Sequence, residues 1–320
     1  MSQPFPARLP LVRQDVDRNA GVRADPGLID RLRADPATRV LPIARGRALA
    51  AEQVDGSAPR LDLLPPDAIP TAETWIYLGL STSVSSVEAP GTPLLAAVLT
   101  DAAASALQSE ELRWAGLRSI AAHLDDRDAG LFTEAIAVAN WHDSHRFCPR
   151  CGTATDTVQA GWVRLCPVDN VEVFPRTDPA VIVRITDDAD RILLGSNALW
   201  EPNRYSLLAG FVEPGESFEA AVLRETHEES GLRVANPVYL GSQPWPFPAS
   251  IMVGFGATLA DDEAPHAVVP DGEEILELRW FSREQLREAF AEILLPGPSS
   301  IAHAIVADWY GSPLESAQDG

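Results

Sequence analysis

Apolar and polar residues follow distinct patterns along this 320-residue chain. Near the start, residues 74–80 and 94–99 are short apolar runs that predict strands, and residues 103–124 have a helical pattern. A second helical stripe has apolar residues at i, i+3, i+4 and i+7: Phe132, Ala135, Ile136 and Ala139. Such a stripe needs a partner surface. We therefore expect an N-terminal α+β domain over residues 1–142, with a scaffold or dimerisation role.

The second half mixes strand and helix signals. Strands are expected at residues 181–185, 192–194, 205–208, 251–259 and 275–281, with an acidic turn at residues 187–190 after the first. Ser282 and Gln285 predict a capping box that opens a short helix, and a last helix is expected at residues 299–309. This order indicates an α+β or layered α/β/α unit over residues 176–310, followed by a C-terminal tail at 311–320.

Composition and charge exclude several classes of protein. Apolar residues make up 46% and charged residues 22%, which is ordinary for a globular chain. The net charge of −21 repels polyanions, which argues against a nonspecific nucleic-acid binder, although a local basic patch could still exist. No stretch approaches the roughly 20 apolar residues of a membrane helix. Residues 1–13 also lack the apolar core of a signal peptide, and we expect a cytoplasmic protein with no membrane partner.

A glutamate-rich helix carries the strongest chemical signal. Ser217 is a candidate N-cap and Gly231 a candidate C′ residue. Between them, Glu225, Glu228 and Glu229 are spaced by three and four positions, so they share one helix face. Three carboxylates repel each other unless a cation lies between them, and Mg²⁺ or Mn²⁺ prefers such oxygen ligands. A solvated acidic face is the alternative interpretation.

The spacing of the wider segment favours the metal site. It resembles the box of the Nudix hydrolases, with Thr226 where an aliphatic residue is usual, through Gly210, Glu216, Arg224, Glu225, Glu228, Glu229, Gly231 and Leu232. Arg224 could hold the carboxylates in register through a bidentate pair. The resemblance implies a Nudix α/β/α sandwich with a mixed sheet over residues 176–310. Such enzymes cleave nucleoside diphosphates linked to another moiety.

Ten residues after the box, three prolines alternate with Trp245 and Phe247. The residues alone allow two interpretations: rings displayed for stacking on a planar base, or a rigid loop that buries its own rings. The string resembles the SQPWPFPxS signature of the NADH pyrophosphatase branch. That branch splits NAD(H) into NMN(H) and AMP and removes NAD caps from RNA 5′ ends. By resemblance the substrate-binding residues are Gln243, Pro244, Trp245, Pro246, Phe247, Pro248, Ala249 and Ser250.

The same resemblance implies further roles. Arg224, Glu225, Glu228 and Glu229 would be catalytic. The metal would be bound by Ala209 through its carbonyl, Glu225, Glu228, Glu229 and Glu274, with Glu273 as the competitor for Glu274. Substrate would also contact Phe211, Glu274, Ala302 and Phe174. Phe174 stands where the family has an aromatic residue that reaches adenine from the partner subunit, which implies a homodimer.

The three cysteines form a separate cluster. Cys148 and Cys151 make a Cys-x-x-Cys pair, and Cys166 is followed by Asp169 where the family has a fourth cysteine. A Cys₃Asp zinc site is chemically reasonable, and His145 is an alternative fourth ligand. A ribbon without metal, held by packing of Trp162 and Phe147, is the other interpretation. We therefore expect a zinc-ribbon-like linker over residues 143–175.

Together these patterns predict a homodimeric NAD(H) diphosphatase that needs Mg²⁺ or Mn²⁺ and carries Zn²⁺ in its ribbon. Two alternatives remain. One is a Nudix hydrolase of another nucleoside diphosphate derivative, such as ADP-ribose. The other is a non-catalytic nucleotide sensor, which has no need for the complete set Glu225, Glu228 and Glu229. The ranking of NADH, NAD⁺ and NAD-capped RNA stays open at this stage.

Overall fold

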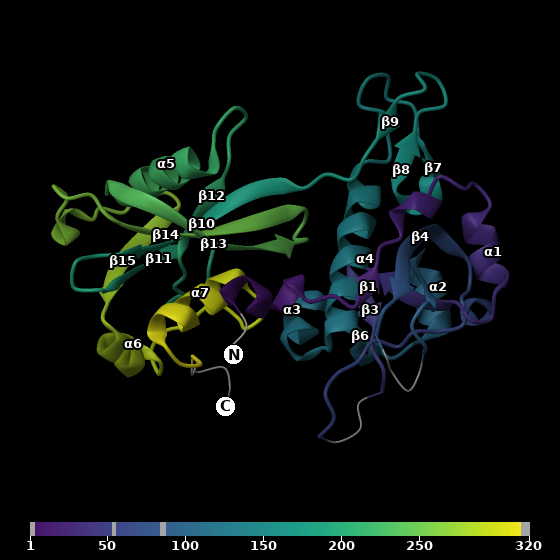
Figure 1. Cartoon of the computed structure of the whole chain (residues 1–320), viewed down its shortest axis with the longest axis horizontal. Helices are drawn as coiled ribbons and strands as arrows, with labels where there is room; N and C mark the ends of the chain where they lie inside the picture. Colours follow the sequence, from purple (N-terminus) through teal and green to yellow (C-terminus); the bar gives the residue numbers. More distant parts are fainter. Residues whose placement is uncertain (1–3, 53–55, 84–87, 315–320) are drawn as a thin grey trace. The chain divides into compact units, whose positions relative to one another are not determined.

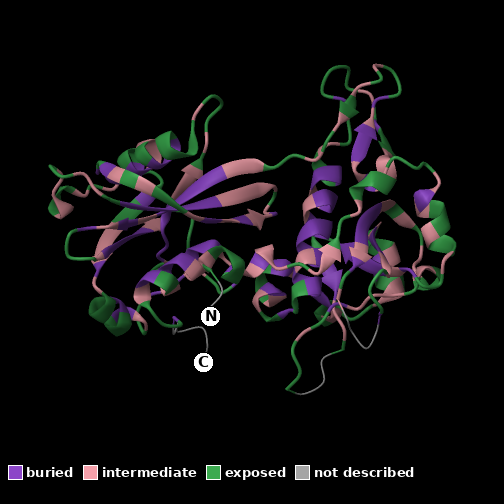
Figure 2. Cartoon of the chain, in the orientation of Figure 1, coloured by how far each residue is buried: buried purple, intermediate pink, exposed green. Residues whose placement is uncertain are grey.

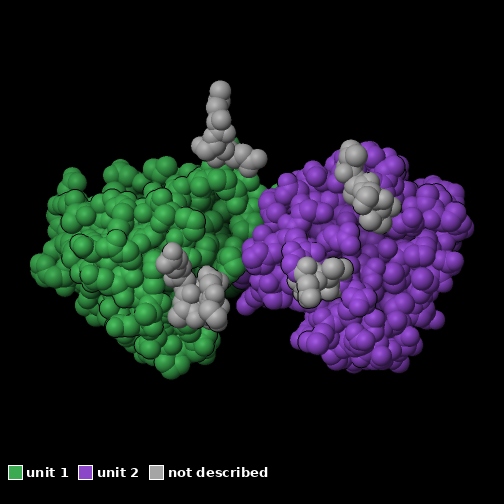
Figure 3. Space-filling view, turned by 90° about the horizontal axis from the view of Figure 1, so that it is seen from below, with its two compact units in different colours: residues 1–12, 178–244, 250–320 green, residues 13–177, 245–249 purple. Residues whose placement is uncertain are grey.

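The structure is a computed structural model that describes residues 4–52, 56–83 and 88–314 (Figure 1). The chain forms two compact units, which are coloured separately in Figure 3. Unit 1 comprises Met1–Val12, Asp178–Pro244 and Ser250–Gly320, apart from the residues outside the described ranges. Unit 2 comprises Arg13–Thr177 and Trp245–Ala249, with the same exception.

Unit 1 is built on a mixed sheet. Its strands are β10 (Asp178–Thr186), β11 (Ile192–Asn197), β12 (Leu208–Phe211), β13 (Val234–Trp245), β14 (Ser250–Leu259) and β15 (Ile275–Phe281). The order is β13-β14-β10-β11-β15, and β12 pairs with β10. The β10–β14 pair is parallel, whereas β10 pairs antiparallel with β11 and β12. The predicted mixed sheet is therefore confirmed.

Helices cover both faces of this sheet. Successive side chains of β10 point to opposite faces, and both faces carry apolar side chains that need to be covered. Val181 and Val183 pack in one core cluster with residues of α5 (Phe218–Ser230). Ile182 points the other way and packs with residues of α6 (Arg283–Ala289) and α7 (Ile301–Tyr310). The buried residues follow the central strands in Figure 2. The predicted α/β/α sandwich is confirmed.

The first described residues complete the core of unit 1. Two short 3₁₀ helices, η1 (Phe5–Arg8) and η2 (Pro10–Val12), flank Leu9. The Leu9 side chain is fully buried in the cluster under α7. A further 3₁₀ helix, η8 (Pro265–Ala267), precedes β15. The amino-terminal segment thus stabilises the same unit that carries the glutamate helix.

Unit 2 contains a second six-stranded sheet in the order β1-β4-β5-β2-β3-β6. Its strands are β1 (Val16–Asp17), β2 (Arg39–Ala44), β3 (Arg47–Leu49), β4 (Ala72–Ser81), β5 (Pro93–Leu99) and β6 (Trp114–Gly116). Its helices are α1 (Leu28–Ala34), α2 (Asp101–Leu107), α3 (Leu117–Ile120) and α4 (Asp126–Ser144). Single 3₁₀ turns are η3 (Ala20–Val22), η4 (Pro66–Ala68), η5 (Glu111–Arg113), η6 (Ala121–His123) and η7 (Gln159–Gly161).

Helix α4 is the central element of unit 2. The predicted stripe that contains Phe132, Ile136 and Ala139 is buried, and the burial extends well around the helix. The Asp125 side chain caps its start by accepting from the Asp128 N–H. A three-stranded ribbon follows, in the order β7 (Asp156–Val158), β8 (Val163–Leu165) and β9 (Glu172–Val173).

Most predicted elements are confirmed, and two are wrong. The predicted helix at 103–124 is broken: α2 ends at Leu107, and strand β6 and helix α3 follow. The Trp114 indole N–H donates to the Gln108 carbonyl, which fixes a turn where the apolar pattern suggested a continuous helix. The predicted strand at 205–208 is out of phase, because β12 begins at Leu208 and pairs with β10 through Phe211.

No helix within residues 4–52, 56–83 and 88–314 is long and apolar enough to cross a membrane. The boundaries of the four predicted segments stay predictions. The compact units group the chain differently: residues 4–12 lie in unit 1, Trp245–Ala249 lies in unit 2, and unit 2 also includes the predicted ribbon at residues 143–175. Residues 315–320 of the predicted tail, and residues 1–3, lie outside the described residues.

Candidate active site

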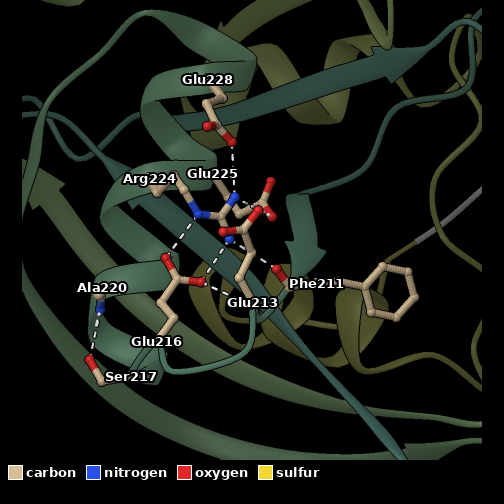
Figure 4. Close-up of polar contacts among 8 residues, drawn as sticks. All are labelled: Phe211, Glu213, Glu216, Ser217, Ala220, Arg224, Glu225 and Glu228. Atoms are coloured by element: carbon tan, nitrogen blue, oxygen red, sulfur yellow. Dashed lines mark hydrogen bonds and ion pairs between the residues drawn. The ribbon is translucent and has the colours of Figure 1, made fainter.

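Helix α5 presents the glutamates and is capped as predicted. The Ser217 hydroxyl accepts the Ala220 N–H at 3.1 Å (Figure 4). At the other end Gly231 adopts a left-handed conformation with φ of 69°, which glycine reaches without the steric cost of a Cβ. The helix therefore begins and ends where the sequence places its caps, and this fixes the direction of its glutamate face.

Arg224 links this helix to the loop in front of it. Its Nε and Nη2 atoms each donate to one oxygen of the Glu216 carboxylate at 2.8 Å. Nη2 also donates to the Phe211 carbonyl at 3.0 Å (Figure 4). The hydrogen bonds from Arg224 lower the pKa of Glu216 to about 2, so this bidentate pair stays ionised over the working pH range of most enzymes.

The same guanidinium orders two of the glutamates. Arg224 Nη1 donates to Glu225 Oε1 and to Glu228 Oε2, each at 2.9 Å. The two carboxylates differ in environment, since the Glu228 side chain is 57% exposed and the Glu225 side chain 14%. Arg224 thus holds a buried and an exposed carboxylate in fixed positions.

Glu229 is the most buried member of the cluster. It is 5% exposed and accepts the Ala209 backbone N–H. Its Oε2 atom is buried and has no hydrogen-bond partner among the described residues. Burial, with the charges of Glu225, Glu274 and Asp271, raises the pKa of Glu229 to about 8. A buried carboxylate oxygen without a donor is costly, and a bound cation would remove that cost.

Glu274 supplies a fourth acidic group from the loop before β15. Its charge raises the pKa of both Glu225 and Glu229, for which burial is the largest cause. Of the two candidates, Glu274 and not the neighbouring Glu273 is among the charges that act most strongly on these groups. The Asn197 side-chain amide donates to Glu274 Oε1 at 3.3 Å. Glu274 is therefore the acid that faces the α5 cluster.

Sequence reasoning missed the residues that shape this loop. Asp271 Oδ1 accepts the backbone N–H groups of Glu273, Glu274 and Ile275 at 2.8 to 2.9 Å. Asp-Gly at this point was the available signal, because aspartate bonds nearby backbone N–H groups in turns. Asn197 could not have been found, since its contact with Glu274 joins residues distant in sequence.

The donor set fits a divalent cation such as Mg²⁺ or Mn²⁺. Carboxylates from α5 and from the loop before β15 act on one another electrostatically, and one buried oxygen has no donor in the part of the chain that the structure describes. Hard oxygen ligands of this kind suit these ions. The residues that would hold the ion are Glu225, Glu229 and Glu274, with Glu228 more exposed beside them and the Ala209 carbonyl proposed by resemblance.

The predicted substrate residues of unit 1 fall in three environments. The Phe211 side chain is 59% exposed and points away from the guanidinium cluster (Figure 4). Gln243 is fully buried, accepting the Leu11 N–H and donating to the Ser299 carbonyl. Ala302 is buried in the first turn of α7, and Ser250 begins β14 opposite Asp178. Gln243 thus has a role in holding its own unit together.

The remaining predicted substrate residues, apart from Pro244, belong to unit 2. The rings of Trp245 and Phe247 meet edge to face, with centroids 4.8 Å apart and planes inclined by 68°. Pro246 is buried, whereas Pro244 is half-buried in unit 1, Pro248 is exposed and Ala249 is half-buried. The Phe174 side chain, after β9, is 58% exposed.

The cysteine cluster is brought together within unit 2. The ligand atoms of Cys148, Cys151, Cys166 and Asp169 all lie within 4.8 Å of one another. Cys148 and Cys151 lie in one tight turn, which the Gly152 N–H closes by donating to the Cys148 carbonyl. Cys166 and Asp169 lie in a second turn, which the Asn170 N–H closes by donating to the Cys166 carbonyl. Three sulfurs and one carboxylate oxygen at this separation fit tetrahedral zinc.

The two alternatives for the ribbon are less well supported. The His145 ring hydrogen-bonds with the Ser144 hydroxyl at 2.9 Å and is absent from the cluster. Trp162 does pack, with its indole N–H bonded to the Tyr77 carbonyl and the Arg23 guanidinium over its ring. Phe147, by contrast, is 62% exposed and provides little packing.

The sandwich and its glutamate helix are those of a Nudix hydrolase. The NUDIX domain family model matches residues 176–298. The NADH pyrophosphatase zinc ribbon model matches residues 143–174, and the NADH pyrophosphatase-like rudimentary NUDIX model matches residues 37–141.

Individual proteins of similar sequence agree with these family matches. The chain is 39% identical over 321 residues to the NAD-capped RNA hydrolase NudC of Mycobacterium bovis, covering 96% of this chain and 95% of that protein. The Mycobacterium tuberculosis protein of the same name has the same identity and coverage. Human NAD-capped RNA hydrolase NUDT12 is 37% identical over 201 residues, which cover 58% of this chain and 42% of that protein. The chain therefore belongs to the NADH pyrophosphatase family of Nudix hydrolases, which confirms the predicted resemblance.

Proposed function

We propose that this enzyme hydrolyses the diphosphate of NAD(H), yielding NMN(H) and AMP, and that it also removes NAD caps from RNA 5′ ends. One water molecule is consumed: its oxygen forms a new bond to one phosphorus as the bond from that same phosphorus to the bridging oxygen breaks. The bridging oxygen stays on the other phosphorus, and the two protons of the water are shared between the products and solvent. The two phosphates leave as monoesters. A free dinucleotide and a capped RNA end contain the same diphosphate, so one site serves both.

The observation that carries this proposal is the buried Oε2 of Glu229, which has no hydrogen-bond partner within residues 4–52, 56–83 and 88–314. Burial, together with the neighbouring carboxylates, raises the pKa of Glu229 to about 8. Without a cation, such a cluster of carboxylates would repel a nucleotide, because the phosphates of the nucleotide are also negatively charged. A divalent cation between the carboxylates and the phosphates would remove this repulsion. When bound, Mg²⁺ or Mn²⁺ neutralises diphosphate charge and polarises the P–O bonds.

Residues of the chain bind the cation, position its ligands and accept a proton. Glu225, Glu229 and Glu274 hold the cation, and Arg224 keeps Glu225 in register. Glu228 is the most exposed member of the α5 set, so it is the group that a water molecule can reach. We assign to it a role as an additional ligand or as the base that accepts a proton from the attacking water. Arg224 Nη1 donates to the Oε2 atom of Glu228 at 2.9 Å and so holds the carboxylate in place.

Recognition of a dinucleotide is supported by the aromatic residues. The exposed ring of Phe211 adjoins the box and is available to stack on adenine. The string Ser242 to Ser250 matches the signature of the NADH pyrophosphatase branch. The M. bovis relative, aligned over nearly its whole length, is named an NAD-capped RNA hydrolase. ADP-ribose lacks the nicotinamide that such a signature would recognise, and we place it second.

The ribbon and the oligomeric state complete the proposal. We infer one zinc ion per chain at Cys148, Cys151, Cys166 and Asp169, from their mutual proximity. We also infer a homodimer in the cytoplasm, in which Phe174 serves the active site of the partner. The support for this is the resemblance, in which this position carries the aromatic residue that reaches adenine from the partner subunit, and the ring is 58% exposed and so accessible to a second copy.

A comparison of substrates tests the proposal. The values of kcat/KM would be measured for NADH, NAD⁺, NAD-capped RNA and ADP-ribose, with Mg²⁺ and with Mn²⁺. We expect hydrolysis of the first three to products that include a nicotinamide mononucleotide. A preference of more than about tenfold for ADP-ribose would reject the substrate assignment. Binding of NADH without turnover under either metal would indicate a nucleotide sensor instead.

A further inference from the structure

The last residue of β13 and the turn that joins β13 to β14 belong to unit 2 and are together called the Trp245–Ala249 loop. Residues Trp245–Ala249 group with the N-terminal unit by their contacts, although the flanking strands lie in the sheet of unit 1. This loop contains both rings of the proline-aromatic signature. The way unit 2 holds it therefore bears on substrate recognition.

The sequence of the loop limits how it can be held. Pro246 and Pro248 have no backbone N–H, and the Phe247 N–H is used within the loop, bonded to the Trp245 carbonyl at 2.7 Å. Firm attachment to a neighbouring element must then come mainly through the carbonyl groups. A side chain with two N–H groups close together is suited to that task.

Asn140 on α4 is that side chain. Its Nδ2 atom donates to the Pro246 carbonyl at 2.9 Å and to the Pro248 carbonyl at 3.2 Å. Both acceptors are carbonyl oxygens, so only the amide nitrogen of Asn140 can face them, and its two hydrogens account for both bonds. Helix α4 is buried along most of its length, which gives the amide a fixed base.

Arg118 on α3 holds the rings of the same loop. Its guanidinium carbon lies 4.9 Å from the Trp245 ring centroid and 4.2 Å from the Phe247 ring centroid. Both distances are within the roughly 6 Å range of cation–π attraction. One cation thus covers two rings that already meet edge to face. Backbone and side chains of the loop are both fastened to unit 2.

We propose that Asn140 and Arg118 are positioning residues, through which the N-terminal unit holds the Trp245–Ala249 loop in its substrate-binding form. This rests on the proposed function. It assigns the N-terminal unit a part in recognition, because the order of the recognition loop depends on two side chains that neither the Nudix box nor the signature contains.

Steady-state kinetics on the full-length enzyme test the recognition role. Asn140→Ala removes both hydrogen bonds and keeps a good helix former at a half-buried position. We expect KM for NADH to rise about tenfold, corresponding to loss of hydrogen bonds that order the loop, with kcat within about threefold. Arg118→Lys, which keeps the charge but loses the planar group, should raise KM less. Ser144→Ala, one turn along α4 and exposed, is the matched control and should leave both constants unchanged.

Hydrogen exchange supplies a readout that does not depend on activity. In Asn140→Ala, the Phe247 and Ala249 amides should exchange faster, with no change in the buried residues of α4. Unchanged exchange in the loop would overturn the positioning role. Faster exchange with an unchanged KM would overturn the role in recognition. If the wild-type enzyme fails to hydrolyse NADH, the proposed function is rejected, and the exchange measurement alone decides whether Asn140 holds the loop.

Discussion

The Glu225 carboxyl group occupies the space where Gly210 has no side chain. A Cβ built on Gly210 would lie 1.9 Å from Glu225 Cδ and 2.1 to 2.2 Å from its two oxygens. The first residue of the Nudix box is thus a glycine because the helix places a carboxylate directly against its backbone. This contact, together with Arg224 on the other side, defines the position of Glu225.

Gly210→Ala should therefore damage catalysis more than stability. The Glu225 carboxyl group can swing away from a new methyl group, so the fold should survive, but a cation ligand is then displaced. We expect kcat/KM for NADH to fall by about 100-fold, as displacement of a catalytic group by about 1 Å typically does. The melting temperature should change by only a few degrees.

Gly297→Ala is the matched control for this substitution. Gly297 lies in the same unit, and a Cβ there would meet no atom within 4 Å. Its kinetic constants should equal those of the wild type. A Gly210→Ala enzyme with wild-type kcat/KM would contradict the proposed close approach of Glu225.

Arg224→Lys tests the role of the guanidinium that connects the glutamates of the site. Lysine offers one compact charge and cannot replace the paired bonds to Glu216 together with those to Glu225 and Glu228. We expect roughly a tenfold loss of kcat and a weaker apparent affinity for Mn²⁺. The cost in stability should be about 1 kcal/mol or less, because the side chain is partly solvated.

The control for Arg224 is Arg233→Lys, which alters a surface pair with Asp262 and Glu263 in the same unit. The measurement is the activity of the wild type, Arg224→Lys and Arg233→Lys as a function of Mn²⁺ concentration. Equal metal dependence in all of them would show that the Arg224 network does not order the site.

Local patterns were enough to predict the caps at Ser217 and Gly231 and the capping box at Ser282, because these depend on neighbours along the chain. Strand β13 was not predicted. Pro237 and Pro244 interrupt its pattern, and proline is tolerated there because β13 is an edge strand. The contacts of Asn140 with Pro246 and Pro248 span more than 100 residues, so no local signal could reveal them.

Asp169 is expected to be the fourth zinc ligand. Metal analysis of purified protein should find one zinc per chain, and Asp169→Ala should weaken zinc retention against a chelator by at least about tenfold. Asp169→Cys should restore or strengthen it. His145→Ala is the control and should retain zinc normally. Substantially less than one zinc in wild-type protein never exposed to chelator would reject the site.

Buried Glu134 gives unit 2 a predictable dependence on pH. Burial raises its pKa from 4.5 to about 7, opposed by Arg18 and Arg23, whose Nη1 and Nη2 atoms lie 3.6 and 3.9 Å from Glu134 Oε1. Between these pH values the folded state binds more protons than the unfolded state. The stabilisation is therefore complete below pH 4.5 and is lost as pH rises through 7, by on the order of 3 kcal/mol.

Glu134→Gln isolates this contribution. The difference in unfolding free energy between wild type and variant should decline from pH 5 to pH 8 in urea titrations. Glu73→Gln, at an exposed position of the same unit, serves as control and should keep the wild-type profile. A difference between wild type and Glu134→Gln that is independent of pH would show that Glu134 is ionised throughout.

The central claim is that acidic side chains gathered around α5 bind the divalent ions that make the diphosphate cleavable, and Glu229→Gln tests it most directly. Glutamine keeps the shape of this 5% exposed residue and removes its charge. The measurement is kcat for NADH at saturating Mn²⁺, with circular dichroism to verify the fold. We predict a folded enzyme whose kcat is lower by at least about 1,000-fold. A folded variant with kcat close to that of the wild type would remove Glu229 from the mechanism and contradict the account.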